Sequence, residues 1–261
     1  MKNLLSPGLE SAFAQSNGLE REYNEDAVLT LEISYAFQES ARSMGIYAVA
    51  DGMGGHLHGE VASKVAVNRV AATLLEHVFL PHLEPSGLQP PNSLTAIFRE
   101  ALIAAHQEVL QKANGGGTTL TCCLVFGNTL TIAHVGDSRA YSITPDGEMR
   151  LHTRDHSLVK RLVELGQISE REAQNHPQRN VLYRALGQTD PNEADIFSLP
   201  LPSAGYLLLC SDGLWSVVPE EKIAQTIYAY PRLQEACHQL VQLANEGGGP
   251  DNISVILVKF G

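Results

Sequence analysis

Hydrophobic and polar positions divide this chain into short apolar runs and longer segments with a helical repeat. The short apolar runs predict β-strands, at residues 9–15, 27–33, 45–50, 118–126, 129–135, 139–144, 206–210 and 253–260. The helical repeat predicts helices at residues 60–79, 93–113, 219–228 and 233–245. The second of these has the clearest repeat, because Phe98, Leu102, Ala105 and Val109 recur at spacings of four, three and four residues.

Two features of these elements indicate the fold class. Several strands are apolar at consecutive positions, as between Ile253 and Val258, so both of their faces need cover. The predicted helices come in pairs between groups of strands, whereas a doubly wound parallel sheet requires strict alternation. We therefore expect an α+β fold, a four-layer α-β-β-α sandwich of two mostly antiparallel sheets flanked by helix pairs.

The middle of the chain contains three consecutive predicted strands, at 118–126, 129–135 and 139–144. Gly127-Asn128 and Gly136-Asp137 provide turn residues between them, so we expect a meander. Residues 153–190 are more polar and contain only short helix-like pieces. This region predicts a surface insertion within a single domain that spans residues 1–261.

Composition narrows the class of protein. With 44% hydrophobic residues, a chain of 261 residues can bury a large core. A net charge of -11 argues against nucleic acid and anionic membranes as partners. No apolar run is long enough for a secretory signal or a membrane span. The four cysteines, Cys122, Cys123, Cys210 and Cys237, are expected to be buried free thiols in a cytoplasmic protein.

Five aspartates stand where an apolar, strand-like run ends, each beside a Gly, Ser or Asn: Asp26, Asp51, Asp137, Asp212 and Asp251. Taken singly, Asp51, Asp137 and Asp212 are explained as turn residues or helix caps, Asp26 as part of a solvated pair with Glu25, and Asp251 as the start of a loop before the last strand. Taken together they suggest more, because carboxylates repel one another and can be gathered only around a compensating positive charge. A hard divalent cation bound through oxygen supplies that charge. The five aspartates therefore predict a metal-centred acidic site built from strand ends.

Two other kinds of phosphate chemistry do not fit. The glycines between Gly52 and Gly59 lack the dinucleotide-binding spacing, and the segment from Gly115 to Thr119 lacks the lysine of a P-loop. A phosphatase with a cysteine nucleophile needs an arginine six residues after its cysteine. None of the four cysteines has one, which excludes that mechanism.

An ordered series of motifs spans nearly the whole chain. The motifs are Arg21 with Asn24-Glu25-Asp26, Val49-Ala50-Asp51-Gly52-Met53-Gly54-Gly55, Gly117-Thr118-Thr119, His134-Val135-Gly136-Asp137-Ser138-Arg139, Cys210-Ser211-Asp212-Gly213-Leu214 and Asp251-Asn252. Each motif alone is weakly specific. The full series, in this order and spacing, resembles the metal-dependent protein phosphatase (PPM) family, the type 2C Ser/Thr phosphatases, in its bacterial form. The resemblance implies the same sandwich of two antiparallel sheets and helix pairs.

The resemblance also implies a pair of Mn²⁺ or Mg²⁺ ions. Asp51 would bridge both ions, and the backbone carbonyl of Gly52 would bind one of them. Asp212 and Asp251 would hold one ion, and Asp26 would support the other through water. Such a pair of cations offsets the charge of a phosphate ester and activates a bridging water, which attacks phosphorus directly.

Three further roles follow from the same resemblance. Asp137, helped by Asp212, would bind a third and weaker ion. Arg21 would bind phosphate, because its planar guanidinium suits two phosphate oxygens. For the proton that the leaving alkoxide needs, a metal-bound water is the first candidate and His56 the second, since Met53 stands where many eukaryotic members have histidine.

The implied activity is hydrolysis of phosphoserine and phosphothreonine in proteins, opposite a eukaryotic-like Ser/Thr kinase, by a monomer in the cytoplasm. Residues 153–190 would be the family's flap, in which we expect His156 and His176 to be solvated surface residues. Two alternatives stay open. One is a catalytically inactive binding module of the same fold. The other is a dedicated phosphoserine phosphatase of a partner-switching system, which only a survey of substrates would identify.

Overall fold

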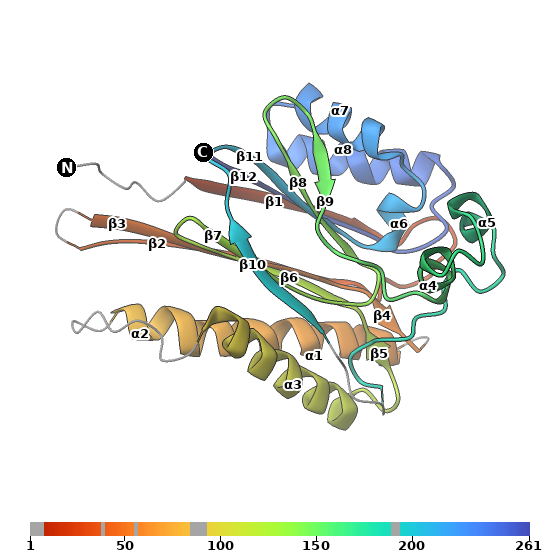
Figure 1. Ribbon diagram of the computed structural model, residues 1–261, viewed down its shortest axis with the longest axis horizontal. Coiled ribbons are helices and arrows are strands. Elements are labelled where there is room, and N and C mark those ends of the chain that lie inside the picture. Colours follow the sequence, from red (N-terminus) through yellow and green to blue (C-terminus); the bar gives the residue numbers. More distant parts are fainter. Residues whose placement is uncertain (1–7, 38–39, 55–56, 84–92, 189–193) are drawn as a thin grey trace.

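The computed structural model describes residues 8–37, 40–54, 57–83, 93–188 and 194–261. Its strands form two large sheets (Figure 1). One sheet has the order β1 (Leu9–Ser16), β12 (Ile253–Phe260), β11 (Gly205–Cys210), β8 (Arg139–Ile143) and β9 (Met149–Leu151). The other has the order β10 (Asp195–Pro200), β7 (Thr129–Val135), β6 (Leu120–Phe126), β3 (Ser40–Ala50) and β2 (Ala27–Phe37). Every pairing among these described strands is antiparallel.

Helices cover the outer face of each sheet, which gives four layers (Figure 1). The β10–β2 sheet is covered by α1 (Leu57–Leu74) and α3 (Leu94–Lys112), and α1 runs through a π-helical turn, η1 (Leu75–Phe79), into α2 (Leu80–Leu83). The β1–β9 sheet is covered by α7 (Glu220–Ala229) and α8 (Leu233–Glu246). The expected α-β-β-α sandwich is confirmed.

Three apolar layers hold the sandwich together, because the central strands bury both faces. In β12, Val255 and Leu257 pack under α7 and α8, whereas Ile256 and Val258 pack between the two sheets. Alternate residues of a strand point to opposite faces, so this single apolar run serves two layers. All four cysteines are buried and unpaired, as the sequence predicted.

The expected meander is wrong at its third strand. The β6–β7 hairpin lies in one sheet, but β8 crosses to the other sheet and pairs with β11. Residues Gly136, Asp137 and Ser138 form this crossover, not a hairpin turn. A short apolar strand does not encode its partner, and a Gly-Asp pair changes the chain direction equally well in either setting. The crossover matters because it brings Asp137 to the junction of the two sheets.

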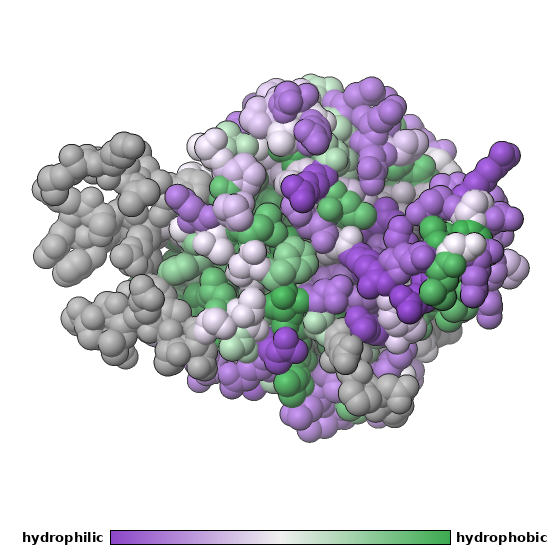
Figure 2. Space-filling model, in the orientation of Figure 1, coloured by the Kyte–Doolittle hydropathy of each residue, from purple (hydrophilic) through white to green (hydrophobic). Residues whose placement is uncertain are grey.

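Two short strands and three short helices lie at the end of the molecule where the two sheets meet. A two-stranded ladder of β4 (Gly52–Met53) and β5 (Gly117–Thr118) follows β3, and α6 (Asp212–Trp215) follows β11. Between β9 and β10 lie α4 (Leu158–Glu164) and α5 (Glu170–Gln174), within the segment expected to be the flap. Figure 2 shows hydrophilic side chains gathered over this end of the visible face, with a small apolar patch among them. None of the described helices combines the length and the apolar character that crossing a bilayer requires.

Candidate metal-dependent phosphatase site

The five predicted aspartates come from five separate chain segments, and the fold brings their charges together. Asp26 precedes β2, Asp51 follows β3, Asp137 lies in the crossover, Asp212 begins α6 and Asp251 precedes β12. Asp51 is at the centre. Burial raises the pKa of its carboxyl well above the ordinary value, and so do the negative charges of the other four aspartates. The two sheets therefore converge on one acidic cluster.

Asp26 is held in place from one side only. Its Oδ2 accepts hydrogen bonds from the hydroxyls of Ser211, at 2.9 Å, and Ser254, at 2.6 Å. Its Oδ1 is buried and has no hydrogen-bond partner. Burial raises the pKa of Asp26 to about 7 against the opposing effect of the two hydroxyls. One oxygen is thus fixed, and the other is left without the donor or cation that a buried carboxylate requires.

Asp212 repeats this pattern at the start of α6. Its Oδ1 is also buried without a hydrogen-bond partner. Burial, followed by the negative charge of Asp251, raises the pKa of Asp212 to about 6. Two orphaned carboxylate oxygens in one acidic cluster fit a hard divalent cation, for which carboxylate oxygens are the usual ligands. The donor set contains no thiolate that would favour a soft metal.

The carboxylates do not yet form a complete ligand shell. Within the part of the chain that the structure describes, no three acidic, histidine or cysteine side chains converge on a single point that could hold one ion. The expected sharing of an ion by Asp51, Asp212 and Asp251 therefore requires rearrangement. Water and backbone carbonyls must supply the remaining ligands, as is common for Mg²⁺.

Gly52 is fixed by close backbone contacts beside Asp51. A Cβ atom at this position would lie 2.3 Å from the carbonyl oxygen of Gly59 and 2.5 Å from that of Glu25. The Gly52 amide also donates to the Glu25 carbonyl at 3.2 Å. The backbone at Gly52, including its carbonyl, is consequently held between the segment that carries Asp26 and the start of α1.

Hydroxyl groups connect the Asp51 loop to the crossover. The Asp51 amide donates to the Thr119 hydroxyl at 2.9 Å, and that hydroxyl shares a hydrogen bond with the Ser138 hydroxyl, 2.7 Å away. Thr121 donates to the Ser138 carbonyl at 2.7 Å. This chain of bonds fixes the distance between the backbones at Asp51 and Asp137. Thr119 and Ser138 belong to the motifs of the sequence, but their role there was not recognised.

Asn252 organises the loop that carries Arg21. Its buried side chain accepts from the Glu25 amide at 2.8 Å, and it donates to the carbonyls of Asn17 and Tyr23 at 3.0 and 2.9 Å. All of these partners are backbone groups of the β1–β2 connection. Asn252 thereby ties this loop to the neighbouring Asp251, a function that the sequence did not reveal.

Arg21 lies next to a predicted ligand. Its Nη2 donates to Asp251 Oδ2 at 2.8 Å, and the Arg21 side chain is 51% exposed. The other oxygen of Asp251 accepts from the Asn252 amide at 2.8 Å. Both oxygens of Asp251 are thus engaged, and a cation that binds this carboxylate must share an oxygen with one of these donors or displace it.

Asp137 is the most enclosed of the five, with 6% of the residue exposed. Its carbonyl accepts from Trp215 Nε1 at 3.0 Å. Burial, followed by the charge of Asp212, raises the pKa of its carboxyl well above the ordinary value. The Arg139 guanidinium opposes this rise. It stacks 3.6 Å from the centre of the Trp215 ring and makes two hydrogen bonds to Asp155, at 3.0 and 2.7 Å.

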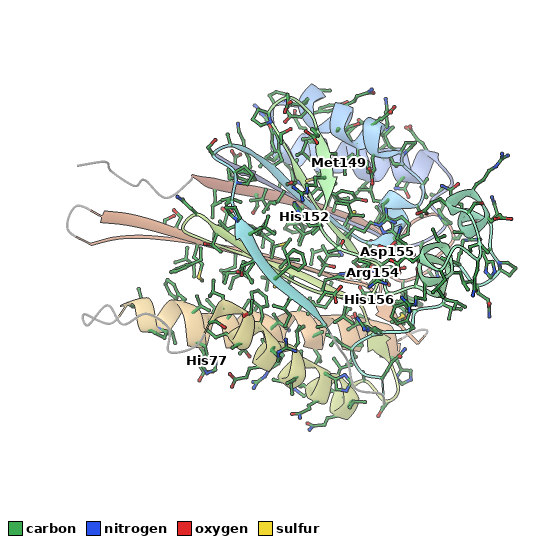
Figure 3. All side chains as sticks on the ribbon, viewed as in Figure 1. His77, Met149, His152, Arg154, Asp155 and His156 are labelled. Carbon is green, nitrogen blue, oxygen red and sulfur yellow. The ribbon has the colours of Figure 1, made fainter. Side chains whose placement is uncertain are left out.

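The two histidines of the segment expected to be the flap differ from each other. His156 was expected to be a surface residue, but it is fully buried, and its neighbours Arg154 and Asp155 lie beside it (Figure 3). The prediction failed because burial follows from the crossover that His156 contacts, which periodicity cannot show. His176, in the same segment, is half-buried. His56, the second candidate for the proton donor, lies outside the described residues.

Comparison with known proteins identifies the family. A family model described as Protein phosphatase 2C matches residues 21–246. The chain belongs to the protein phosphatase 2C family. It is 37% identical over 251 residues to the serine/threonine phosphatase stp of Listeria innocua, a match that covers 96% of both chains. The family predicted from the motifs is confirmed.

Solved structures of this family share the whole fold. The Mycobacterium tuberculosis serine/threonine phosphatase PstP/Ppp superposes with a TM-score of 0.78 at 35% identity, over 96% of this chain and 98% of that one. The catalytic domain of PstP in complex with two manganese ions gives a TM-score of 0.76 at 34% identity, over 97% and 98% of the two chains. The expected α+β sandwich and Ser/Thr phosphatase class agree with these relatives.

Proposed function

We propose that this member of the protein phosphatase 2C family hydrolyses phosphoserine and phosphothreonine in proteins, with two Mn²⁺ or Mg²⁺ ions as cofactors. The observation that carries the proposal is the cluster of five aspartates in which Asp26 and Asp212 each have a buried, unpartnered oxygen. Such oxygens are costly in a folded protein unless a cation binds them. The complex of the related PstP catalytic domain with two manganese ions supports the same number of ions here.

The proposed ligands follow the placement of the side chains. Asp51, at the centre of the cluster, would bridge two ions, and the fixed carbonyl of Gly52 would bind one of them. Asp212 and Asp251 would hold one ion, and Asp26 would support the other through water. When bound, the ions would offset the charge of the phosphate and activate a water for direct attack on phosphorus.

Asp137 and Arg21 would complete the site. Asp137, with Asp212 as its charged neighbour, would take a third, weaker ion. Arg21 would exchange its bond to Asp251 for two bonds to phosphate oxygens, because a guanidinium binds phosphate through parallel donors. As Arg21 moves to the phosphate, Asp251 gains a free oxygen. For the proton of the leaving alkoxide, a metal-bound water remains the first candidate and His56 the second.

The partners of this activity are phosphorylated proteins. We further propose that a eukaryotic-like Ser/Thr kinase phosphorylates them and that the enzyme acts as a monomer in the cytoplasm. Its four buried free thiols support a reducing compartment. Its net charge of -11 disfavours nucleic acid and anionic membrane surfaces as partners.

Hydrolysis of a phosphothreonine peptide tests this function directly. We expect turnover with Mn²⁺ and none after dialysis against EDTA. Asp51→Asn and Asp212→Asn should each lower kcat by more than about 100-fold, because each removes a charge that holds the ions. Asp146→Asn is the matched control, since Asp146 is exposed in the turn between β8 and β9. Turnover that persists in EDTA would exclude the metal mechanism, and peptide binding without any turnover would favour the inactive binding module.

A further inference from the structure

His156 joins the flap to the crossover through both its backbone and its ring. The His156 amide donates to the Gly136 carbonyl at 2.7 Å, and the Gly136 amide donates to His156 Nδ1 at 3.1 Å. The side chain is fully buried. Gly136 precedes Asp137, so His156 is hydrogen-bonded to the crossover at the residue next to a predicted metal ligand.

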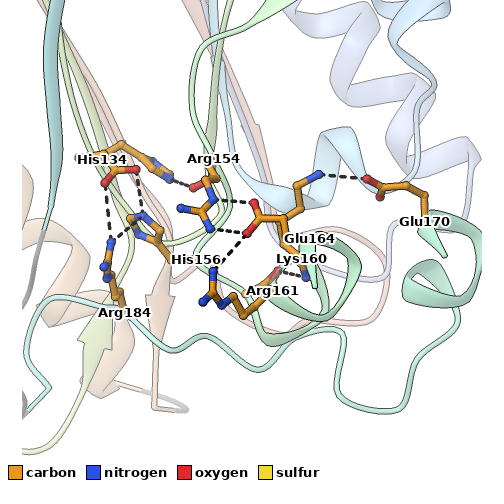
Figure 4. A network of polar contacts seen from close by, with 10 residues as sticks. His134, Arg154, His156, Lys160, Arg161, Glu164, Glu170 and Arg184 are labelled. Atoms are coloured by element: carbon orange, nitrogen blue, oxygen red, sulfur yellow. Dashed lines mark hydrogen bonds and ion pairs between the residues drawn. The ribbon is translucent and has the colours of Figure 1, made fainter. Parts of the chain in front are cut away.

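The contacts of the ring define its proton arrangement. Because Nδ1 accepts from an amide, the proton of the neutral ring lies on Nε2. Nε2 is 3.3 Å from Asp195 Oδ2, at the start of β10, and donates to it. Arg184 lies beside both groups, with its Nη1 3.7 Å from Asp195 Oδ1 and 3.4 Å from His156 Nε2 (Figure 4). Because a guanidinium only donates, the second contact is not a hydrogen bond when Nε2 carries the proton. Burial lowers the pKa of His156, which keeps the ring in the neutral form that this arrangement needs.

The neighbouring flap residue holds the other end of the crossover. Asp155 makes two hydrogen bonds to Arg139, the residue that follows Ser138. Two consecutive flap residues therefore bind the two residues that flank the Asp137-Ser138 pair. Trp215 donates to the Asp137 carbonyl and Thr121 to the Ser138 carbonyl. Asp155 and His156, which we call the flap base, therefore hold the backbone on both sides of the Asp137-Ser138 pair.

We propose that His156 is a positioning residue for the phosphatase reaction, which orients Asp137 toward the other aspartates through the hydrogen bond between its Nδ1 and the Gly136 amide. The inference rests on the proposed function for its kinetic consequence, but its structural consequence is independent of turnover. Because His156 is hydrogen-bonded to Gly136, the position of the flap determines the position of Asp137. A flap base that shifts carries Gly136 with it and changes the distance between Asp137 and Asp212.

Two substitutions separate the two hydrogen bonds of the ring. In His156→Asn the amide oxygen occupies the place of Nδ1 and retains an acceptor for Gly136. In His156→Gln the amide nitrogen occupies the place of Nε2 and retains a donor for Asp195 but leaves the Gly136 amide unpaired. We expect kcat to remain within about threefold of the wild type for His156→Asn and to fall by about tenfold for His156→Gln, with KM for the phosphopeptide changed less than about twofold in both. His176→Ala, in the same flap, should leave both constants unchanged.

Manganese binding supplies a readout that does not depend on turnover. Titration with Mn²⁺, followed by the electron paramagnetic resonance of the free ion, should show that His156→Gln weakens or loses the weakest ion, whereas His156→Asn retains it. A loss of activity in both variants with unchanged Mn²⁺ binding would overturn the inference, and so would full activity in both. If the wild type binds Mn²⁺ but hydrolyses no phosphopeptide, the proposed function fails, and the Mn²⁺ titration still decides the role of His156.

A measurement on the wild type removes dependence on the folding of the variants. The nitrogen chemical shifts of the imidazole, in protein labelled with ¹⁵N-histidine, distinguish the ring nitrogen that carries the proton. We expect a protonated Nε2 and an unprotonated Nδ1 for His156 throughout the neutral pH range. A proton on Nδ1 would contradict the hydrogen bond from Gly136 and reject the proposed role.

Discussion

Arg21 and Asp251 form an ion pair in which Nη2 donates to Oδ2 at 2.8 Å. The predicted phosphate-binding group is therefore bonded to a predicted metal ligand. Arg21 has two competing partners, because its guanidinium cannot serve Asp251 and an incoming phosphate with the same donors. The pair links substrate binding to metal binding. Loss of Arg21 should therefore affect the affinity for the phosphorylated substrate and the affinity for the metal ion in opposite directions.

Arg21→Ala should weaken substrate binding and strengthen metal binding. Loss of the bidentate phosphate contact should raise KM for a phosphothreonine peptide by about tenfold, since charge-assisted bonds contribute about 1.5–3 kcal/mol. Loss of the positive charge frees Asp251 and removes a repulsion, so the apparent Kd for Mn²⁺ should fall. Steady-state kinetics and calorimetric Mn²⁺ titration measure the two effects. Arg232→Ala, at an exposed position before α8, is the control, and a weaker Mn²⁺ affinity in Arg21→Ala would contradict the link.

The buried carboxylates predict how the stability of the metal-depleted protein depends on pH. Burial raises the pKa of Asp26 from 3.8 to about 7 and that of Asp212 from 3.8 to about 6. The folded state therefore keeps protons that the unfolded state releases near pH 4. By linkage, the free energy of unfolding in EDTA should fall as the pH rises from about 4 to 7. Saturating Mn²⁺ should oppose this decline by compensating the carboxylate charges.

Asp212→Asn tests the origin of the decline. Removing the charge of Asp212 should make the metal-depleted protein more stable than the wild type at pH 7.5, although the same variant is inactive. Urea unfolding in EDTA at pH 5 and pH 7.5 measures both the slope and the difference. Asp146→Asn should leave the slope unchanged. An Asp212→Asn protein that is less stable than the wild type at pH 7.5 would show that the carboxylate is stabilised in another way.

The sequence predicted the site best where the same kind of residue, an aspartate beside an apolar run, recurs along the chain. Asp26, Asp51 and Asp212 could be selected because each stands at one end of an apolar run, and the structure places all three in one cluster. The sequence was silent on groups that act only through contacts. Ser254 and Trp215 lie inside a strand and a short helix, and nothing in their local pattern announces a bond to Asp26 or Asp137.

The predicted topology failed for a related physical reason. Periodicity shows that β8 is apolar, but it does not distinguish pairing with β7 from pairing with β11. The Asp-Gly pairs were likewise interpreted, taken singly, as turn signals. In the structure, Gly213 is required for another purpose, because a Cβ there would lie 2.2 Å from the Asn252 carbonyl oxygen. Such close approach of distant backbones becomes visible only in the folded chain.

Thr119→Val should disturb the site without removing any charge. Valine has nearly the same shape but leaves the Asp51 amide and the Ser138 hydroxyl without their partner. We expect a loss of about 1–3 kcal/mol in the free energy of unfolding and a lower kcat, because buried donors that lose their acceptor are costly. Thr119→Ser keeps the hydroxyl and should recover most of the activity. A larger loss in the serine variant than in the valine variant would assign the effect to packing by the methyl group, which valine retains.

Gly52→Ala should be among the most damaging single-methyl changes near the site. The new Cβ would overlap two backbone carbonyl oxygens, those of Gly59 and Glu25, and neither can move as a flexible side chain would. The cost should be about 3 kcal/mol or more in the free energy of unfolding. The shift should also displace the Gly52 carbonyl and the adjacent Asp51, so Mn²⁺ affinity should fall together with stability.

Gly8→Ala provides the matched comparison for this last prediction. A Cβ at Gly8 meets the Gly261 carbonyl oxygen at 3.6 Å, an ordinary van der Waals contact, so stability and Mn²⁺ affinity should remain unchanged. Thermal unfolding in EDTA separates the backbone clash from the loss of metal binding, because the clash persists without ions. If Gly52→Ala unfolds in EDTA at the wild-type temperature, α1 or the Glu25 segment yields more easily than the close contacts imply. The carbonyl of Gly52 would then not be rigidly placed for an ion.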